Sequence, residues 1–131
     1  MNKEFISYEQ ALALRELGFD KCVINVYCLE SKELVLCEDD EMIWAPVLSN
    51  NGATIAAPLK QQAFRFFREK HKLVADIRSE HLGYYTSIGN RDVMMRIVMK
   101  PVNIFETYEE AESACLEKLI EIVKNKENDN T

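Results

Sequence analysis

The chain has 131 residues, of which 47% are hydrophobic and 29% charged, and its formal net charge is -6. This length suits one domain that buries its own hydrophobic core, and four glycines and three prolines are too few for a disordered or collagen-like chain. The acidic balance repels phosphate backbones and disfavours binding of bulk nucleic acid, although it leaves a local basic surface open.

The first residues, "MNKEFISYEQ", lack the apolar centre of a signal peptide, and no stretch approaches the roughly 18 apolar residues of a membrane span. We therefore expect a cytoplasmic protein that does not associate with membranes. The cysteines at positions 22, 28, 37 and 115 form no C-x-x-C pair, and neither histidine lies at metal-ligand spacing from them. Reduced, buried thiols and the absence of a metal or cofactor are the expectation.

The first predicted element is a helix over residues 8–17. Ser7 and Gln10 have the spacing of a capping box, in which each side chain bonds the other residue's backbone N–H. Gly18 then supplies the left-handed residue that commonly follows a helix. The pentad "SYEQA" that opens this helix returns as "TYEEA" at residues 107–111, which we interpret as a repeated helix-start pattern rather than a duplicated unit.

Two strand-like runs follow, "KCVINVYCLE" and "KELVLCE", and they meet near Ser31 and Lys32. This arrangement predicts a β-hairpin. By the period of two, the first strand has one all-apolar face, which we expect to face the core. The residues of that face are Cys22, Ile24, Val26 and Cys28.

Residues 38–57 have the composition of a loop, with an Asn51-Gly52 turn signal. An acidic run, Glu38 to Glu41, could collect a divalent cation, but it lacks the alternating oxygen ligands and the glycine of a calcium loop, so a solvated loop is favoured. Trp44 is the single tryptophan. It is either an interface anchor or a side chain folded back onto the core.

A central helix is predicted over residues 58–72, with Pro58 at its first position. One arc of this helix is apolar, and another carries a basic stripe. The stripe could contact phosphates or an acidic protein surface, although a solvated helix face is the simpler interpretation. The residues of the stripe are Gln61, Arg65, Arg68 and Lys72.

Three further strands are predicted over residues 73–79, 83–88 and 93–99, with Gly89-Asn90 as a turn between the last two. Tyr84 and Tyr85 are neighbours on a strand, so one is expected to pack and the other to be exposed.

Residues 108–124 form the last predicted helix, which begins with a second capping box at Thr107 and Glu110 and ends in a polar tail over 125–131. Glu112 projects into the apolar arc of this helix. A buried carboxylate there could act as an acid or base, but a peripheral helix glutamate is favoured.

The predicted order is α-β-β-α-β-β-β-α. Short connections and hairpin signals favour an antiparallel sheet of about five strands, with the three helices on one face in two layers. The fold class is therefore α+β, and residues 1–124 are expected to form a single domain.

Three segments, "SYEQALALRELGFD", "AAPLKQQAFRFFREKHKL" and "ETYEEAESACLEKLIEIV", carry a resemblance that covers about a third of the chain. The chain resembles a group of short proteins without known activity from Bacteroides-type gut bacteria and their phages or other mobile elements. Phe66 stands where that group has tryptophan. The resemblance implies a cytoplasmic protein of bacterial or phage origin and supplies no activity to carry over.

No glycine-rich phosphate loop, zinc-protease motif or nucleophile elbow is present in the sequence. We therefore expect a small non-catalytic protein that acts through protein–protein contacts, either with a partner or as a homodimer. The alternative is a nucleic-acid-binding accessory protein that uses the basic stripe. A third hypothesis is an enzyme or ligand-binding module built around Glu112 or the acidic loop.

Overall fold

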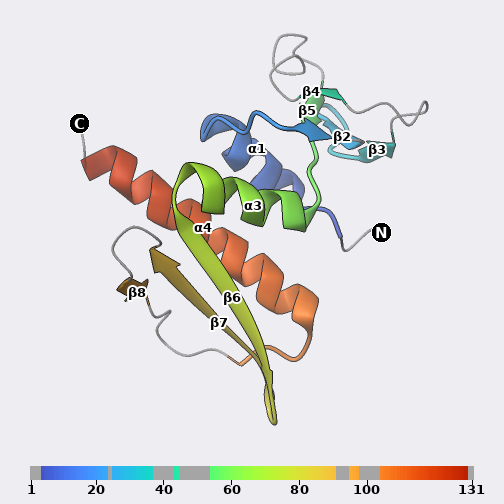
Figure 1. Cartoon of the computed structure of the whole chain (residues 1–131). Helices are drawn as coiled ribbons and strands as arrows, with labels where there is room; N and C mark the ends of the chain where they lie inside the picture. Colours follow the sequence, from blue (N-terminus) through green and yellow to red (C-terminus); the bar gives the residue numbers. More distant parts are fainter. Residues whose placement is uncertain are drawn as a thin grey trace. The chain divides into compact units, whose positions relative to one another are not determined.

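The structure is a computed structural model that describes residues 4–23, 25–36, 43–44, 54–90, 95–97 and 104–129. The chain divides into two compact units, Met1–Ala63 and Phe64–Thr131, and the boundary lies inside helix α3. Each unit combines helix with antiparallel strands (Figure 1). The predicted α+β class is confirmed, and three helices are present among the described residues.

The first unit is built from short strands. A three-stranded antiparallel sheet has the order β3-β2-β5, and β1 pairs with β4 in a separate ladder. Tyr27 of β2 donates a hydrogen bond to the carbonyl oxygen of Ile6, which ties the sheet to the segment before the first helix. The elements are α1 (Tyr8–Glu16), β1 (Cys22–Val23), β2 (Asn25–Cys28), β3 (Leu34–Leu36), β4 (Ile43–Trp44) and β5 (Thr54–Ala56).

Helix α1 begins as the sequence predicts. The Ser7 side chain accepts a hydrogen bond from the Gln10 backbone N–H at 3.2 Å, and the Gln10 side chain accepts one from the Ser7 N–H at 3.1 Å. This capping box satisfies two of the N–H groups that a helix start leaves without partners. Gly18 follows the helix with a φ of 87°, so the predicted left-handed residue is confirmed.

The second unit is a hairpin sheet backed by a long helix. Strands β6, β7 and β8 form an antiparallel sheet in that order, and α4 packs against β6 and β7 (Figure 1). The elements are the part of α3 (Lys60–Lys70) that follows Ala63, and then β6 (Leu73–Glu80), β7 (Gly83–Asn90), β8 (Met95–Ile97) and α4 (Tyr108–Asp129).

Burial in the second unit follows the period of each element. In β6, Leu73 is buried whereas Val74, Asp76 and Arg78 are exposed, as expected for a strand with one covered face. The apolar residues of this unit that are at most 1% exposed are Phe66, Phe67, Leu73, Ile88, Ala111, Cys115, Leu116 and Leu119.

The prediction of a single five-stranded sheet is wrong. Among the described residues the strands form three antiparallel sheets, of two, three and three strands. Part of the difference lies in β4 and β5, which occupy the region predicted as a loop. Strands of two or three residues are too short to show alternation in sequence, and β5 is held by pairing with β2, a contact distant along the chain.

The predicted core face of the first strand is also only partly correct. Val26 is buried, but Val23 and Asn25, from the other face of the pattern, are 0% and 1% exposed, and Cys28 is partly exposed. The strand is split into β1 and β2, which pair in different sheets, so one alternation does not run through it.

Several boundaries differ from those predicted. β7 continues through Gly89 and Asn90, which pair with β6 and β8 instead of forming a turn. Helix α3 ends at Lys70, and α4 continues to Asp129, into the segment expected to be a polar tail. No helix within the described ranges combines the length and the apolar composition that crossing a membrane requires.

Candidate functional site

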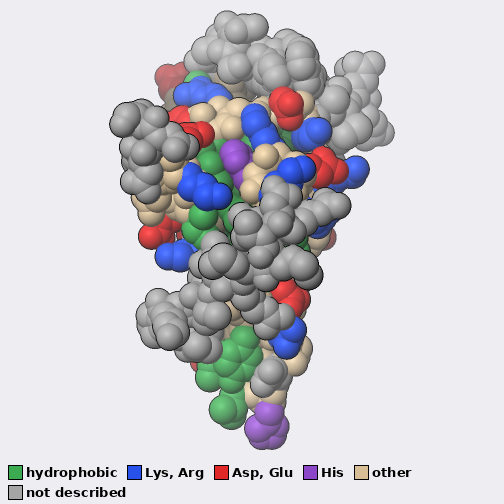
Figure 2. Space-filling model, turned by 60° about the vertical axis from the view of Figure 1, so that its left-hand side comes forward, with side chains coloured by type: hydrophobic (Ala, Val, Ile, Leu, Met, Phe, Trp, Pro, Cys, Tyr) green, Lys and Arg blue, Asp and Glu red, His purple; other side chains and the backbone are tan. Residues whose placement is uncertain are grey.

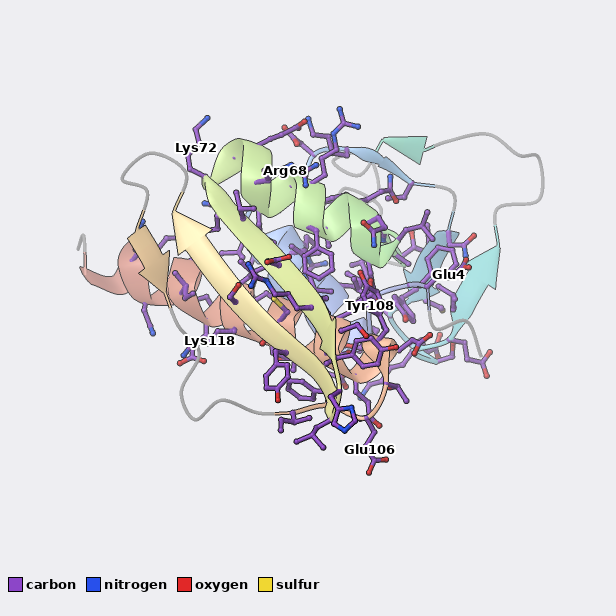
Figure 3. The ribbon with its side chains drawn as sticks, turned by 60° about the horizontal axis from the view of Figure 1, so that its bottom comes forward. Glu4, Arg68, Lys72, Glu106, Tyr108 and Lys118 are labelled. Carbon is purple, nitrogen blue, oxygen red and sulfur yellow. The ribbon has the colours of Figure 1, made fainter. Side chains whose placement is uncertain are left out.

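The predicted basic stripe is exposed, but it does not form one continuous row on a helix. Gln61, Arg65 and Arg68 are exposed residues of α3, whereas Lys72 lies beyond the end of the helix. Lys72 has a φ of 59°, a left-handed conformation that breaks the helical spacing on which the prediction of Lys72 depended. Figure 3 shows Arg68 and Lys72 directed away from the ribbon near the end of α3.

Two of the basic groups at this end of α3 have partners on the helix itself. Arg65 donates a hydrogen bond from Nε to Glu69 Oε1 at 2.8 Å, which raises the pKa of Arg65, and Lys70 Nζ lies 5.5 Å from the centre of the Phe66 ring. Arg68 and Lys70 are also in the last turn, where positive charge is stabilised by the helix dipole. These local contacts explain much of the basic stripe without a ligand.

His71 lies directly after α3, between this basic surface and the aromatic core. Its ring centre is 5.4 Å from that of Phe66 and 5.8 Å from that of Phe67. Burial lowers the pKa of His71, and the positive charges of Lys70 and Lys126 lower it further, against an opposing effect of Glu127. No described residue gives a hydrogen bond to its buried Nε2 atom, so the neutral imidazole is favoured.

The other residues selected from the sequence do not converge on this surface. Trp44 lies in β4, where its backbone pairs with Cys22, instead of in a loop, and its side chain lies outside the described part of the chain. The acidic run at residues 38–41 also lies outside the described residues. Glu112 is buried on α4, with 6% of its surface exposed, so the favoured interpretation of a peripheral glutamate is wrong. No group of three or more metal-ligating side chains occurs within the described residues.

The two described thiols differ in environment. Cys115 is buried in α4, and burial raises its pKa to about 12, with a smaller contribution from the negative charge of Asp76. Cys28 is partly exposed, and hydrogen bonds from the backbone and side chain of Ser31 and from the backbone of Glu30 lower its pKa. The prediction of buried thiols is therefore confirmed for Cys115 and wrong for Cys28.

Three of the five large hydrophobic side chains that are exposed among the described residues lie around the tip of the β6–β7 hairpin. Leu82, in the turn, has 71% of its surface exposed, Ile104 46% and Tyr108 40%. Figure 2 shows hydrophobic side chains exposed together beside a histidine at the lower end of the face drawn. We call this region the tip surface and define it by Leu82, Tyr84, Ile104, Phe105 and Tyr108.

Backbone contacts hold the tip surface together. Tyr84 donates its N–H to the carbonyl oxygen of Phe105 at 2.9 Å, and Phe105 donates to Tyr84 at 3.0 Å. The rings of Tyr84 and Tyr108 meet edge to face with their centres 5.8 Å apart. Strand β7, residues 104–105 and the start of α4 are therefore held together at the tip, and Leu82 precedes them in the turn.

Gly83 allows the close approach at the centre of this surface. A Cβ atom on Gly83 would lie 2.6 Å from the carbonyl oxygen of Phe105 and 2.7 Å from Cγ2 of Ile104, and its φ is +146°. Both the space and the backbone conformation therefore select glycine at this position.

Acidic side chains border the tip surface. Glu106, Glu109 and Glu110 are all exposed at the start of α4, where negative charge is stabilised by the helix dipole. Figure 3 shows Glu106 and Tyr108 beside the end of the hairpin. An apolar centre with a charged border has the layout of a protein-binding surface.

The functional candidates predicted from the sequence do not include Leu82, Ile104 and Phe105. A signal was present, because "HLGYY" places a large apolar residue directly before a glycine in what reads as a turn. Phe105 lies between the last predicted strand and the last predicted helix. Its backbone pairing with Tyr84 depends on a contact distant in sequence, so no local pattern indicates it.

No family model, curated protein or solved structure matches the chain. The resemblance to short proteins of Bacteroides-type bacteria stays a prediction. Any assignment of function therefore depends on the surfaces themselves.

Proposed function

We propose that the chain is a small non-catalytic protein of the cytoplasm that binds a partner protein through the tip surface. The observation that carries this proposal is the 71% exposure of Leu82 next to Ile104 and Tyr108, which are 46% and 40% exposed. Contiguous exposed apolar area costs free energy in water, and large aromatic and apolar side chains are the usual anchors of protein interfaces.

The acidic border specifies the chemistry of the partner. A complementary surface would present an apolar side chain to Leu82 and Tyr108, with lysine or arginine placed to face Glu106, Glu109 and Glu110. Border charges of this kind contribute more to the association rate and to its salt dependence than to the lifetime of the complex.

A capture experiment with matched variants tests the proposal. The tagged full chain is crosslinked in its native host, and the proteins recovered by wild type, Leu82→Asp and Val35→Asp are compared. Val35, in β3, is 47% exposed, so its substitution places the same charge on another exposed apolar residue. We expect a stoichiometric partner with wild type and Val35→Asp that is lost with Leu82→Asp. Equal recovery with both variants, or no specific partner with wild type, contradicts the proposal.

Nucleic-acid binding is the second candidate, because Arg68 and Lys72 are exposed near the end of α3. The net charge of -6 and the local partners of Arg65 and Lys70 weigh against it. It predicts salt-sensitive binding of labelled DNA or RNA that is lost in Arg68→Glu. If DNA and RNA give no change in fluorescence anisotropy with wild type at low salt, nucleic-acid binding is excluded. If Arg68→Glu binds as tightly as wild type, the basic stripe is not the contact.

A further inference from the structure

Strand β6 has one edge that no described strand covers. The sheet order is β6-β7-β8, so β6 pairs with β7 on one side, and its other side is the boundary of the sheet within the described residues. β6 has eight residues, all paired in register with β7. A regular edge of this length is a template for another strand, and proteins usually shorten or interrupt such edges.

The hydrogen bonds of Tyr84 determine which residues of β6 face that edge. Tyr84 exchanges both backbone hydrogen bonds with Phe105, on the side of β7 away from β6. Its register partner on β6, Ser79, is therefore in a non-hydrogen-bonded pair, and the N–H and C=O groups of Ser79 point outward. Because the pattern alternates, those of Ile77 and Ala75 also point outward.

Two opposite charges lie on the exposed face of the same edge. Arg78 Nε donates a hydrogen bond to Asp76 Oδ2 at 3.0 Å, and the two side chains are 57% and 50% exposed. They are placed symmetrically, one residue before and one residue after Ile77. A two-fold axis at Ile77 would therefore bring Asp76 of each copy opposite Arg78 of the other.

We propose that two copies of the chain associate by antiparallel pairing of their β6 edges around a two-fold axis at Ile77. The pairing joins the two three-stranded sheets into one continuous sheet. Ile77 faces Ile77 of the second copy, and Ala75 faces Ser79 of the second copy, with their outward backbone groups bonded. The Asp76 and Arg78 pairs lie at the intervening positions, where opposed side chains are closest.

The charges select this register over its neighbours. An axis at Asp76 places two aspartates directly opposite each other, and an axis at Arg78 does the same with two arginines. Directly opposed like charges destabilise a strand pair, whereas opposite charges stabilise it. The inference adds self-association to the proposed function and depends on β6, not on the tip surface.

Charge reversal tests the pairing in the full chain. Sedimentation velocity across a range of concentrations gives the dimer dissociation constant of wild type, Asp76→Arg, Arg78→Asp and the double variant. Each single reversal opposes like charges at both symmetric positions, so we expect a rise in the dissociation constant of about tenfold or more. The double variant restores opposite charges and is expected to return to within about threefold of wild type.

Amide hydrogen exchange of wild type gives a second readout that needs no variant. The N–H groups of Ala75, Ile77 and Ser79 should gain protection as protein concentration rises. The N–H groups of Asp76 and Arg78, which bond to β7, should be protected at every concentration and serve as the internal control.

Three outcomes overturn the inference. The first is a monomer at every concentration. The second is a dimer whose dissociation constant is the same in the single and double variants, which would place the contact elsewhere. The third is equal exchange of the outward amides at low and high concentration. Loss of partner capture in Leu82→Asp, with the dimer unchanged, separates this proposal from that of the tip surface.

Discussion

The basic end of α3 and the tip surface, both in the second unit, are exposed to similar degrees but differ in how their side chains are supported. At the end of α3, Glu69 holds Arg65, and Lys70 lies over Phe66. At the tip, Leu82 projects from a turn with 71% of its surface in solvent. The contacts of the charged surface are accounted for by helix stability, whereas the apolar surface is the one proposed to bind a partner.

The difference bears on how candidate sites are ranked. A basic stripe is easily seen in a sequence, yet exposed ion pairs and helix-end charges occur on many helices without a ligand. An exposed leucine near aromatic residues is harder to recognise in a sequence, because Phe105 and Tyr108 lie twenty or more positions away from it along the chain. Variants that remove the packing contacts at the end of α3, or the exposed leucine at the tip, test whether the two surfaces differ in this way.

The largest effect is expected for Phe66→Ala. Phe66 is 1% exposed, and its ring contacts Phe67 and His71 and supports Lys70. Truncation of a buried aromatic ring leaves a cavity and typically costs about 3–5 kcal/mol of unfolding free energy. Urea denaturation followed by circular dichroism measures this loss. A loss below about 1 kcal/mol would show that the end of α3 does not depend on its aromatic core.

Gly83→Ala should have the next largest effect. The added methyl group collides with the Phe105 carbonyl and with Ile104, and the backbone is in a region that alanine rarely adopts. We expect a loss of about 1–3 kcal/mol in unfolding free energy, together with weaker partner capture. Ser79→Ala, on the opposite strand, is the stability control. Full stability in Gly83→Ala would mean that the tip surface is not closely packed.

The partly buried position of His71 predicts that the unfolding free energy depends on pH. Its pKa is lowered in the folded protein, so the unfolded chain binds a proton more readily. The contribution of neutral His71 to stability is complete above its ordinary pKa of about 6.5 and is lost as pH falls below it. The slope cannot exceed about 1.4 kcal/mol per pH unit for one proton.

Unfolding free energies measured between pH 5 and 8 check this pH dependence. His71→Gln should reduce the slope of unfolding free energy against pH. His81→Gln, in the exposed hairpin turn, is the matched comparison for the loss of one histidine. An identical slope in wild type and His71→Gln would assign the pH dependence to other groups.

The smallest stability effect is expected for Leu82→Ser. A residue that is 71% exposed contributes little to the core, so we expect a change below about 0.5 kcal/mol. The same variant should nevertheless lose the captured partner. Thermal unfolding measured beside the capture experiment checks both. A loss of more than about 1 kcal/mol would show that Leu82 packs in the fold and is not a free contact residue.

The sequence predicted the parts of the fold that depend on neighbouring residues. The capping box of Ser7 and Gln10 and the left-handed Gly18 are determined within a few positions, and both are confirmed. At the second pentad, Thr107 accepts a hydrogen bond from the Glu110 backbone at 3.1 Å, which is one of the two bonds of the predicted capping box. Helix α3 was predicted to continue to Lys72 but ends at Lys70. The left-handed backbone of Lys72 could not be predicted, because lysine rarely adopts that conformation and no neighbouring residue indicates it.

Contacts distant in sequence were not predictable. The pairing of β2 with β5 and that of Tyr84 with Phe105 depend on residues about twenty to thirty positions apart. Hairpin signals indicate which strands pair with each other. They do not indicate how many sheets the paired strands form, so a single five-stranded sheet was predicted. The candidate site depends on the same distant contacts, so the basic stripe was predicted and the tip surface was missed.

The packing of α4 on β6 and β7 also has a consequence for synthesis of the protein. The hairpin is local and can form as soon as its residues leave the ribosome, whereas α4 begins at Tyr108 and emerges later. Until then the inner face of the hairpin, with Leu73 and Ile88, has no cover from α4, and the outer edge of β6 is also open. A nascent chain arrested before α4 should therefore need a chaperone to avoid aggregation.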